Sequence, residues 1–321
     1  MASTDRIRVG IVGAGRIARR RIAPAISRSS QVLLAAAASR DITRARSLGA
    51  QRSYDDYARL IDDPGIDMVY VATHNGLHAQ LAIASLMAGK HVLCEKPLAR
   101  NAQECTEILQ AADASGLKVM EAFMYRYRPE IRKATELCLE GRIGDVMVVE
   151  ASFRFPMTAP DDVRLRADWG GGALLDVGCY CVNVSRLFLG DSPTRVTALA
   201  ALDQAHGVDR SVQGVLEYGD GKFAIISCGF ESGLHQKVAL AGTAGSIEIN
   251  QPFVSRAGDS RLTVCSDQRE DVLQFAPADP YLLEIDDFAH AVRTGSEPLI
   301  PAVDSQRNAV ILDRLAASFQ A

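Results

Sequence analysis

The stretch that decides the fold is IRVGIVGAGRIA, residues 7–18. The apolar run 7–12 predicts a buried strand, and the glycines after it predict a tight turn into a helix over 16–28. The turn, GAGRIA, has the G-x-G-x-x-A form of a dinucleotide-binding loop. Its first glycine allows the bend, its second lets the backbone approach a diphosphate, and its small last residue packs the helix on the sheet. We therefore expect a dinucleotide here rather than a purely structural turn, bound by Gly13, Gly15, Arg16 and Ile17.

Strand and helix patterns alternate through the first third of the chain. The strand patterns after the first are at 31–38, 67–73, 91–94 and 118–123, with helix patterns between them at 41–48, 77–88 and 102–115. This alternation predicts an α/β domain of the Rossmann type, a doubly wound parallel sheet covered on both faces. We expect this domain to occupy residues 1–123.

The pattern changes after residue 123. Helices are predicted at 129–139 and 173–189, a half-exposed strand at 146–155, and two closing helices at 281–293 and 304–319. Strand-like runs otherwise follow one another, at 196–202, 211–218, 222–230, 236–241, 246–249 and 261–265. Strands without helices between them predict a mostly antiparallel sheet with segregated helices. We expect a C-terminal α+β domain over 124–321 that binds substrate.

Composition excludes several classes of protein. The 321 residues are 48% hydrophobic and 23% charged, as in ordinary globular chains, and the net charge of −4 offers no basic surface for nucleic acid. We find no run near the ~18 apolar residues of a membrane span and no signal peptide. The seven cysteines lack a Cys-x-x-Cys pair, and His74 and His78 lack a third ligand nearby. We expect a cytoplasmic protein with reduced thiols, and no metal, membrane or nucleic-acid partner.

The end of the second strand, ASRD at 38–41, bears on the choice of cofactor. An NAD site usually has an acidic residue at this strand end, which accepts a hydrogen bond from the ribose 2′-hydroxyl. Here Ser39 and Arg40 stand there, with Arg44 one helical turn on, and a hydroxyl with two guanidinium groups suits a 2′-phosphate. We therefore expect NADP. NAD remains the alternative if Asp41 turns back to the ribose, and a solvated helix start is the other explanation for the arginines.

A lysine follows the strand at 91–94, in the tripeptide EKP at 95–97. Ligands of parallel sheets bind at the carboxyl ends of the strands, so Lys96 is a candidate site residue, with a surface loop as the alternative. Pro97 is a candidate for a cis peptide bond. Three residues at or after the end of the 67–73 strand are expected near the same crevice, although His78 could instead cap or line its helix: Thr73, Asn75 and His78.

Asp176 and Tyr180 lie four residues apart in the predicted helix 173–189, so both should face one side of it. The surroundings are apolar, and an aspartate there needs a partner or a cavity. A helix-start aspartate and a core tyrosine are the alternative readings. A tyrosine with a pKa near ~10 is a poor base. A lysine ammonium at ~4 Å, worth roughly 4 kcal/mol at an effective dielectric of ~20, would lower that pKa by up to about three units, against an opposing desolvation cost.

We therefore expect Tyr180 to exchange the proton of a reacting hydroxyl, with Lys96 tuning it. Lys96 could instead donate the proton while Tyr180 positions the substrate. Asp176 is expected to orient substrate hydroxyls or Lys96 rather than to transfer the proton.

Together these motifs resemble the Gfo/Idh/MocA family of oxidoreductases over essentially the whole chain. The resemblance rests on residues 13–18, EKP at 95–97 and GGGALLD at 170–176. Three further strings resemble the branch of dimeric dihydrodiol dehydrogenase and NADP-linked D-xylose dehydrogenase: EAFMYRY at 121–127, DVRL at 162–165 and DVGCYCVN at 176–183. The family implies a large open C-terminal sheet whose exposed face commonly forms the oligomer contact, so a homodimer or homotetramer is expected.

The resemblance also implies roles for single residues. Lys96 is the implied catalytic lysine, Glu95 belongs to the cofactor-facing loop, and Asn75 lies near the nicotinamide ribose. The candidates for substrate contact are Lys96, Arg126, Arg164, Trp169, Asp176 and Tyr180, and a surface role is equally open for Arg126 and Arg164.

The expected function is an NADP-dependent oxidoreductase that moves a hydride between nicotinamide and a CH–OH or C=O group of a sugar or cyclic polyol. It would act as an aldose 1-dehydrogenase or a keto-sugar reductase. A trans-dihydrodiol dehydrogenase is the alternative of the same class. A non-catalytic NADP-binding regulator is the alternative of another class, since a fold does not fix an activity; the presence of Lys96 and Tyr180 argues against it.

Overall fold

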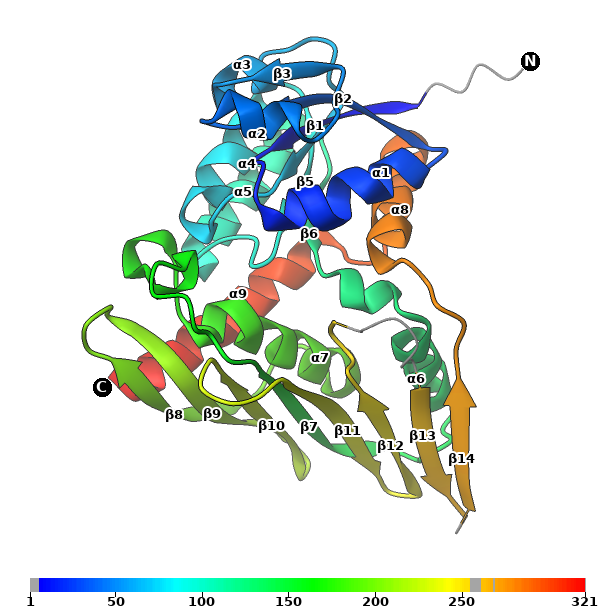
Figure 1. The fold of residues 1–321 in the computed structure, drawn as a ribbon. Helices are drawn as coiled ribbons and strands as arrows, with labels where there is room; N and C mark the ends of the chain where they lie inside the picture. Colours follow the sequence, from blue (N-terminus) through cyan, green and yellow to red (C-terminus); the bar gives the residue numbers. More distant parts are fainter. Residues whose placement is uncertain (1–5, 255–260, 268, 321) are drawn as a thin grey trace. The chain divides into compact units, whose positions relative to one another are not determined.

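The computed structural model describes residues 6–254, 261–267 and 269–320. The chain forms two compact units (Figure 1). The first contains the described residues of Met1–Met124 together with Asp279–Gln306. The second contains those of Tyr125–Ala278 together with Arg307–Ala321.

A six-stranded parallel sheet forms the centre of the first unit (Figure 1). Its strands, in the order β3-β2-β1-β4-β5-β6, are β1 (Ile7–Val12), β2 (Val32–Ala38), β3 (Arg52–Tyr54), β4 (Met68–Val71), β5 (His91–Glu95) and β6 (Val119–Ala122). All four residues of β4 are buried, as expected for a strand covered on both faces. The strand order reverses between β1 and β4, where sheets of this kind bind ligands. The predicted Rossmann sheet is confirmed.

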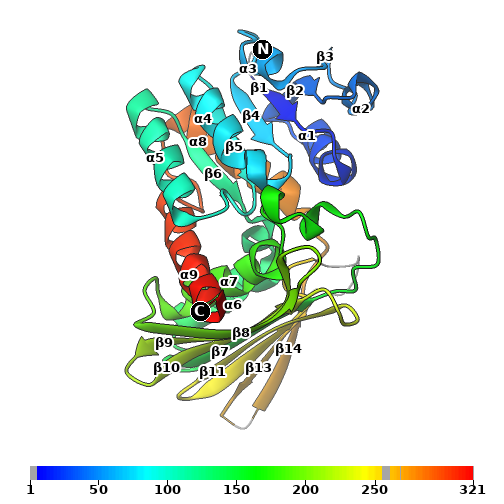
Figure 2. The same cartoon turned by 90° about the vertical axis from the view of Figure 1, so that its left-hand side faces the viewer.

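The helices of the first unit follow the strands in sequence, with one exception. They are a π-helical turn η1 (Ala18–Ile22) continued by α1 (Ala23–Arg28), then α2 (Ile42–Arg46), α3 (Tyr57–Ile61), the 3₁₀ turn η2 (Asn75–Leu77), α4 (His78–Met87) and α5 (Ala102–Ser115). Helices α4 and α5 lie side by side (Figure 2). The exception is α8 (Pro280–Thr294), which follows the second sheet in the chain but packs against α1, β2 and η1. A division of the chain at residue 123 would place α8 in the second domain, whereas α8 packs within the first unit.

An eight-stranded sheet forms the centre of the second unit. Its strands, in the order β14-β13-β12-β11-β7-β10-β9-β8, are β7 (Val146–Arg154), β8 (Arg195–Asp203), β9 (Val208–Gly219), β10 (Lys222–Gly229), β11 (His235–Gly242), β12 (Gly245–Asn250), β13 (Arg261–Ser266) and β14 (Arg269–Gln274). Only the pairing of β10 with β7 is parallel. The predicted large, mostly antiparallel sheet is confirmed.

Helices cover one face of this sheet. In Figure 2, α6 (Pro129–Leu139), α7 (Cys179–Leu189) and the part of α9 (Ala302–Gln320) after Gln306 lie on the same side of it. Side chains that face them are buried, such as Val149 in β7 and Ile226 in β10. Among the described residues no helix covers the other face, where Val215 and Ile225 are each 45% exposed. The short turns of the two units are η3 (Met124–Tyr127), η4 (Val163–Leu165), η5 (Ala167–Trp169) and the π-helical η6 (Leu174–Gly178).

One described helical stretch, Ala167–Leu189, is long and apolar enough to span a membrane by length and composition alone. Within the structure, 78% of its apolar window is buried, and α7 at its end packs on β7 and β10. A buried core helix meets the same criteria, so this stretch is weak evidence for a span.

The start of this stretch depends on a glycine. Gly172 has a φ of +111°, and a Cβ at this position would overlap Oδ1 of Asp209 in β9. The other carboxylate oxygen of Asp209 accepts a hydrogen bond from Leu174 N at 2.7 Å, at the first turn of η6. The absence of a side chain therefore lets the Asp209 carboxylate cap the helix from a neighbouring strand.

Gly172→Ala should lower the free energy of unfolding more than Gly190→Ala does. Gly190 has a similar φ of +100°, but a Cβ there would meet no heavy atom within 4 Å. Both variants carry a backbone cost of roughly 1–3 kcal/mol for a positive φ, and Gly172→Ala should lose about 1–3 kcal/mol more, because it displaces a part-buried cap. Chemical denaturation of the two variants measures the difference. Equal losses would show that the contact with Asp209 contributes nothing.

Candidate active site

The glycine turn after β1 leaves room for a ligand. Gly13 has a φ of +99°, and a Cβ there would lie 2.6 Å from the carbonyl oxygen of Ala72, just after β4. Gly15 is different: the nearest heavy atom to a Cβ would be the same oxygen, at 3.8 Å. A side chain at Gly15 would therefore not meet the protein but would fill the space over the turn that a diphosphate needs. Ala18 is fully buried, as the packing of the helix on the sheet requires.

Beyond the end of β2, the charged residues Arg40, Asp41 and Arg44 differ in whether they have a charged partner within the described part of the protein. Asp41 caps α2, because its Oδ1 accepts hydrogen bonds from Thr43 N at 2.9 Å and Thr43 Oγ1 at 2.5 Å, which lower the pKa of Asp41. Its Oδ2 lies 3.5 Å from Nε of Arg44. Arg40 is exposed and has no carboxylate partner among the described residues. Ser39 is 7% exposed. Both oxygens of Asp41 thus have local partners, while Arg40 is left to solvent.

The loop that carries Lys96 is held in place by neighbouring strands and helices. The peptide bond between Lys96 and Pro97 is cis, as the sequence suggested. Before the lysine, Tyr70 Oη donates to Glu95 Oε1 at 2.9 Å. After it, Leu98 N donates to the buried carboxylate of Glu121 at 2.9 Å. The Lys96 loop is therefore anchored on both sides by side chains from β4 and β6.

A third anchor comes from His78, the first residue of α4. Its Nδ1 lies 2.8 Å from the carbonyl oxygen of Pro97, and its Nε2 lies 3.2 Å from that of Thr73. The ring is 1% exposed, and burial lowers the pKa of His78 to about 4. A neutral ring carries one N–H, so His78 donates to one of these two carbonyls and only lies against the other, between the loop after β4 and the loop after β5. Asn75 is the first residue of η2, which lies between Thr73 and His78 in the sequence.

Two buried groups behind this loop escaped the sequence analysis. Glu284 of α8 is fully buried, and neither of its carboxyl oxygens has a hydrogen-bond partner among the described residues. Burial, followed by the charge of Glu95, raises the pKa of Glu284 well above its ordinary value. The same two causes raise the pKa of Tyr70. A helical pattern places Glu284 on α8, but only the tertiary fold brings α8 against the first sheet.

In the second unit, Asp176 lies in the π-helical turn η6, opposite Arg164 of η4. The Nε of Arg164 donates to Asp176 Oδ2 at 2.6 Å. Its Nη1 lies 3.1 and 3.2 Å from the two oxygens of Asp162. Neither pair is predicted by the sequence pattern, from which Arg164 is only a candidate substrate contact.

Tyr180 lies among aromatic rings at the start of α7. Its ring centroid is 5.3 Å from that of Phe253, 5.4 Å from that of Phe153 and 5.7 Å from that of Tyr125, and the residue is 6% exposed. Sequence spacing placed Asp176 and Tyr180 on one regular helix. The structure instead has a π-helical turn at Leu174–Gly178 before α7, a local irregularity that recurs at functional sites.

The remaining sequence candidates are tied to neighbours within the second unit. Arg126 Nη1 donates to Asn183 Oδ1 at 3.3 Å, and the same oxygen accepts from Tyr125 Oη at 2.5 Å. The guanidinium group of Arg166 lies 4.6 Å from the ring centroid of Trp169. Among the described residues, no group of three or more His, Cys, Asp or Glu side chains could hold a metal ion.

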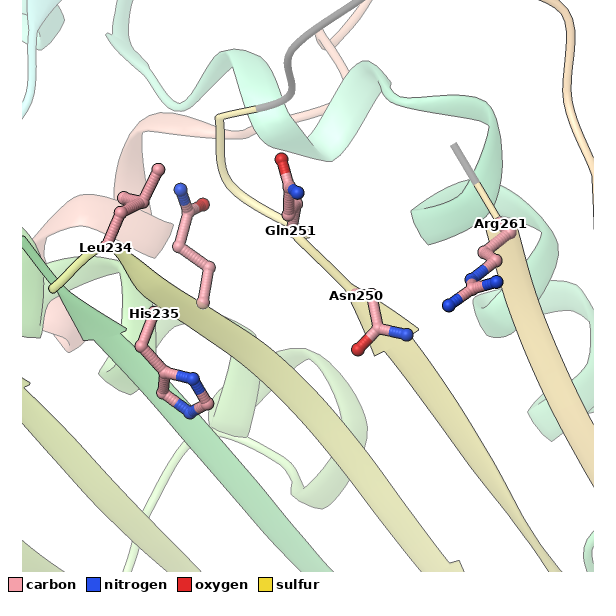
Figure 3. A pocket seen from close by; sticks show the side chains of 6 residues that line it. Leu234, His235, Asn250, Gln251 and Arg261 are labelled. Atoms are coloured by element: carbon pink, nitrogen blue, oxygen red, sulfur yellow. The ribbon is translucent and has the colours of Figure 1, made fainter. Parts of the chain in front are cut away.

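A cavity of about 400 Å³ lies on the second unit, and none of its lining residues belongs to the motifs described above. Figure 3 shows its lining side chains at the ends of neighbouring strands of the large sheet: Leu234, His235, Gln236, Asn250, Gln251 and Arg261. Gln236 is held by the main chain of Val254, to which it donates at 3.2 Å and from which it accepts at 2.8 Å.

Known proteins resemble this chain along nearly its whole length. The family profile described as "Oxidoreductase family, NAD-binding Rossmann fold" matches residues 7–123, and that of the "GFO/IDH/MocA C-terminal domain" matches residues 131–248. D-xylose 1-dehydrogenase (NADP(+)) 2 of Haloferax volcanii is 38% identical over 92% of both chains. Trans-1,2-dihydrobenzene-1,2-diol dehydrogenase of Mus musculus is 31% identical, over 96% of this chain and 95% of that one.

Solved structures of other proteins are also similar to this chain over nearly its whole length. A 3-ketoreductase from Actinomadura kijaniata, in complex with NADP and TDP-benzene, has a TM-score of 0.93 and 31% identity over 98% of both chains. Structures of that enzyme also exist for a tyrosine-to-phenylalanine variant and for variants in which a lysine is replaced by alanine or glutamate.

Acid should destabilise the wild-type protein more than His78→Gln. The pKa of His78 is about 4 in the folded state and near 6.5 in the unfolded state, so between these values the unfolded state binds more protons. Lowering the pH from 6.5 to 4 should therefore remove up to about 3 kcal/mol of stability through His78, which glutamine cannot lose. Denaturation midpoints over this pH range measure the difference, with His290→Gln, an exposed histidine of α8, as the control. Wild-type and His78→Gln curves that stay parallel would contradict the assignment.

Proposed function

Because the chain belongs to the Gfo/Idh/MocA family of oxidoreductases, we propose that it is an NADP-dependent enzyme that acts on a sugar or cyclic polyol. A hydride would pass between nicotinamide and a CH–OH or C=O carbon, in the manner of an aldose 1-dehydrogenase or a keto-sugar reductase. The observation that carries the proposal is the anchored Lys96 loop at the carboxyl end of β5, two strands from a glycine turn with room for a diphosphate. Ligands of such sheets bind at this edge.

The charges beyond β2 support NADP over NAD. The carboxylate of Asp41 already accepts from Thr43 and faces Arg44, so its oxygens are used within the protein rather than for a ribose hydroxyl. The exposed guanidinium group of Arg40 suits a phosphate, for which arginine offers a planar fork of donors. The xylose dehydrogenase relative is named for NADP, and the ketoreductase structure holds it.

Two side chains are proposed to handle the proton. The cofactor, when bound, takes up or gives the hydride at its nicotinamide. In oxidation, the Tyr180 phenolate oxygen takes the proton of the substrate hydroxyl; in reduction, the phenol returns it to the new alkoxide. Lys96 favours the phenolate by its positive charge, while the aromatic rings around Tyr180 oppose it by keeping water away. Lys96 as the direct proton donor stays the alternative, and both assignments are supported by the ketoreductase variants, whose substituted lysine and tyrosine are as far apart in sequence as Lys96 and Tyr180.

A trans-dihydrodiol dehydrogenase is the second candidate, and the aromatic side chains favour it. Tyr125, Phe153 and Phe253 surround Tyr180, an environment that suits the apolar ring of a cyclic diol as well as the apolar face of a sugar. The murine relative carries that activity in its name.

We also propose a cytoplasmic homodimer or homotetramer that associates through the helix-free face of the large sheet. Exposed aliphatic side chains lie on adjacent strands there: Leu199 of β8 is 77% exposed, and Val215 of β9 is paired in register with Ile225 of β10. An apolar row of this kind is typical of a surface that becomes buried in an assembly.

A spectrophotometric screen of aldoses, inositols and dihydrodiols with NADP and NAD tests the proposal. We expect reduction of NADP by at least one aldose or cyclic polyol.

Tyr180→Phe should lower turnover at least ~100-fold, the usual scale of general acid–base catalysis, with NADP binding retained. Tyr57→Phe is the control, because it removes the same hydroxyl group from α3, which is distant from Tyr180 in the sequence. Binding of NADP without turnover of any class would favour the regulator instead, and unchanged turnover in Tyr180→Phe would reject that residue as the proton carrier.

Arg44→Ala should weaken binding of NADP and leave binding of NAD nearly unchanged. One charged hydrogen bond to a phosphate is worth about 1.5–3 kcal/mol, so the dissociation constant for NADP should rise roughly 10- to 100-fold. Arg46→Ala removes a comparably exposed charge from the same helix and should change neither constant. Fluorescence titration with both nucleotides measures this. An equal loss for NAD and NADP would mean that Arg44 does not meet the 2′-phosphate.

A further inference from the structure

One guanidinium group lies between two carboxylates in the second unit. Arg164 uses Nε for Asp176, at 2.6 Å, and Nη1 for Asp162, at 3.1 Å. The ring of Phe155 lies 5.7 Å from the guanidinium carbon. The side chains of Arg164 and Asp176 are 26% and 13% exposed, so water screens this pair much less than a surface ion pair. Asp176 and then Asp162 raise the pKa of Arg164, so the guanidinium group stays charged.

The main chain of Arg164 is fixed as firmly as its side chain. Its N–H donates to Asp162 Oδ1 at 3.0 Å, and its carbonyl oxygen accepts from Gly172 N at 2.9 Å. A Cβ at Gly171 would overlap that carbonyl oxygen, so a glycine is required for the approach. The glycine run that precedes the helix of Asp176 therefore also holds the arginine that faces it.

We propose that Arg164 is a positioning residue that keeps Asp176 ionised and oriented for the reaction, with Asp162 as its second support. The inference rests on the proposed function and refines it, because Arg164 would then act through Asp176 and not by touching the substrate. An ionised, fixed carboxylate only accepts hydrogen bonds, which suits a substrate that presents hydroxyl groups. It is a poor acid, in agreement with Tyr180 or Lys96 as the proton carrier.

Other titratable groups lie on the elements packed against η6. These elements are β7, β9, β10 and α7, and their titratable or charged residues are Glu150 and Arg154 of β7, Asp209, Arg210, Glu217 and Tyr218 of β9, Lys222 and Cys228 of β10, and Cys179, Tyr180, Cys181 and Arg186 of α7. Burial raises the pKa of Cys228 and of Cys181, so both thiols are neutral in the working range. Burial also raises the pKa of Asp209, which makes Asp209 a second possible source of an acid limb in a pH profile. Only a limb that belongs to Asp176 should respond to Arg164.

The kinetic test compares Arg164→Gln and Arg164→Lys with the wild type in pH profiles of kcat. A carboxylate that loses its guanidinium partner takes up a proton more readily. Arg164→Gln should therefore lower kcat roughly 10- to 100-fold and move the acid limb to higher pH, with the dissociation constant for NADP unchanged. Arg164→Lys keeps the charge and should keep the wild-type limb. Arg142→Gln, which breaks an exposed ion pair with Asp271, is the control and should change nothing.

Two results would overturn the inference. A rise in KM for substrate with kcat and its pH profile unchanged would make Arg164 a direct substrate contact. An acid limb that is lost in Asp176→Asn, and so belongs to Asp176, but stays in place in Arg164→Gln would show that Asp176 does not depend on Arg164. If Arg164→Gln does not fold, Arg164→Lys is measured in its place. A rise in KM for substrate with kcat and its pH profile unchanged in Arg164→Lys would also make Arg164 a direct substrate contact and contradict a positioning role.

A measurement without turnover separates this inference from the proposed function. In a double-mutant cycle of Arg164→Gln and Asp176→Asn, the effects on the free energy of unfolding should be non-additive, because each single variant leaves one charged group without its partner. Additive effects would reject the pair even in an active enzyme. Coupled effects in a protein that neither oxidises nor reduces any substrate with NADP or NADPH would keep the pair and reject the proposed function.

Discussion

The cofactor half of the candidate site depends on the close approach of Gly13 to the main chain after β4. Any side chain at Gly13 would meet the carbonyl oxygen of Ala72 at 2.6 Å, and the left-handed φ of the turn excludes most residues as well. From that point, the connection continues along the carboxyl edge of the sheet. The ring of His78 lies against the main-chain carbonyls of both Thr73 and Pro97 and donates its one N–H to one of them, so contacts connect the ends of β1, β4 and β5. Lys96 inherits its position from this chain of contacts.

In the second unit, too, glycines allow close approaches that hold polar groups in place. There a glycine run lets two supports approach a helix start: Asp209 caps the first turn, and the main chain of Arg164 lies against Gly171 and Gly172. In both units the polar groups that matter are held by carbonyls, carboxylates and glycines from elements distant in sequence. Preorganisation of this kind removes the need to order the groups during each turnover.

Local pattern was sufficient for much of this molecule, and the exceptions have physical causes. The helices Ala102–Ser115 and Pro129–Leu139 appear where their patterns predict them, and the glycine turn and the cis bond at Pro97 carry signals within a few residues. The strand β14 is almost wholly exposed, so it shows no apolar alternation, and β3 has only three residues. The π-helical turn at Leu174–Gly178 and the return of α8 to the first sheet depend on contacts with distant segments, which a local pattern does not record. The pairs of Arg164 join residues only two and twelve positions apart, but they depend on the irregular path of the chain through η4 and η5, which has no sequence period.

Glu284 and His78, both fully buried in the first unit, respond to acid in opposite directions. His78 is neutral when folded and costs stability as the pH falls from 6.5 toward 4, since the unfolded chain gains the proton. Burial raises the pKa of Glu284 in the folded state, so below that pKa ionisation favours the unfolded chain, and this advantage shrinks as the pH falls toward about 4.5. As the pH falls from 6.5 toward about 4.5, the contribution of His78 to the free energy of unfolding declines while that of Glu284 grows. The two buried groups therefore give contributions of opposite sign to the pH dependence of the nucleotide-binding half.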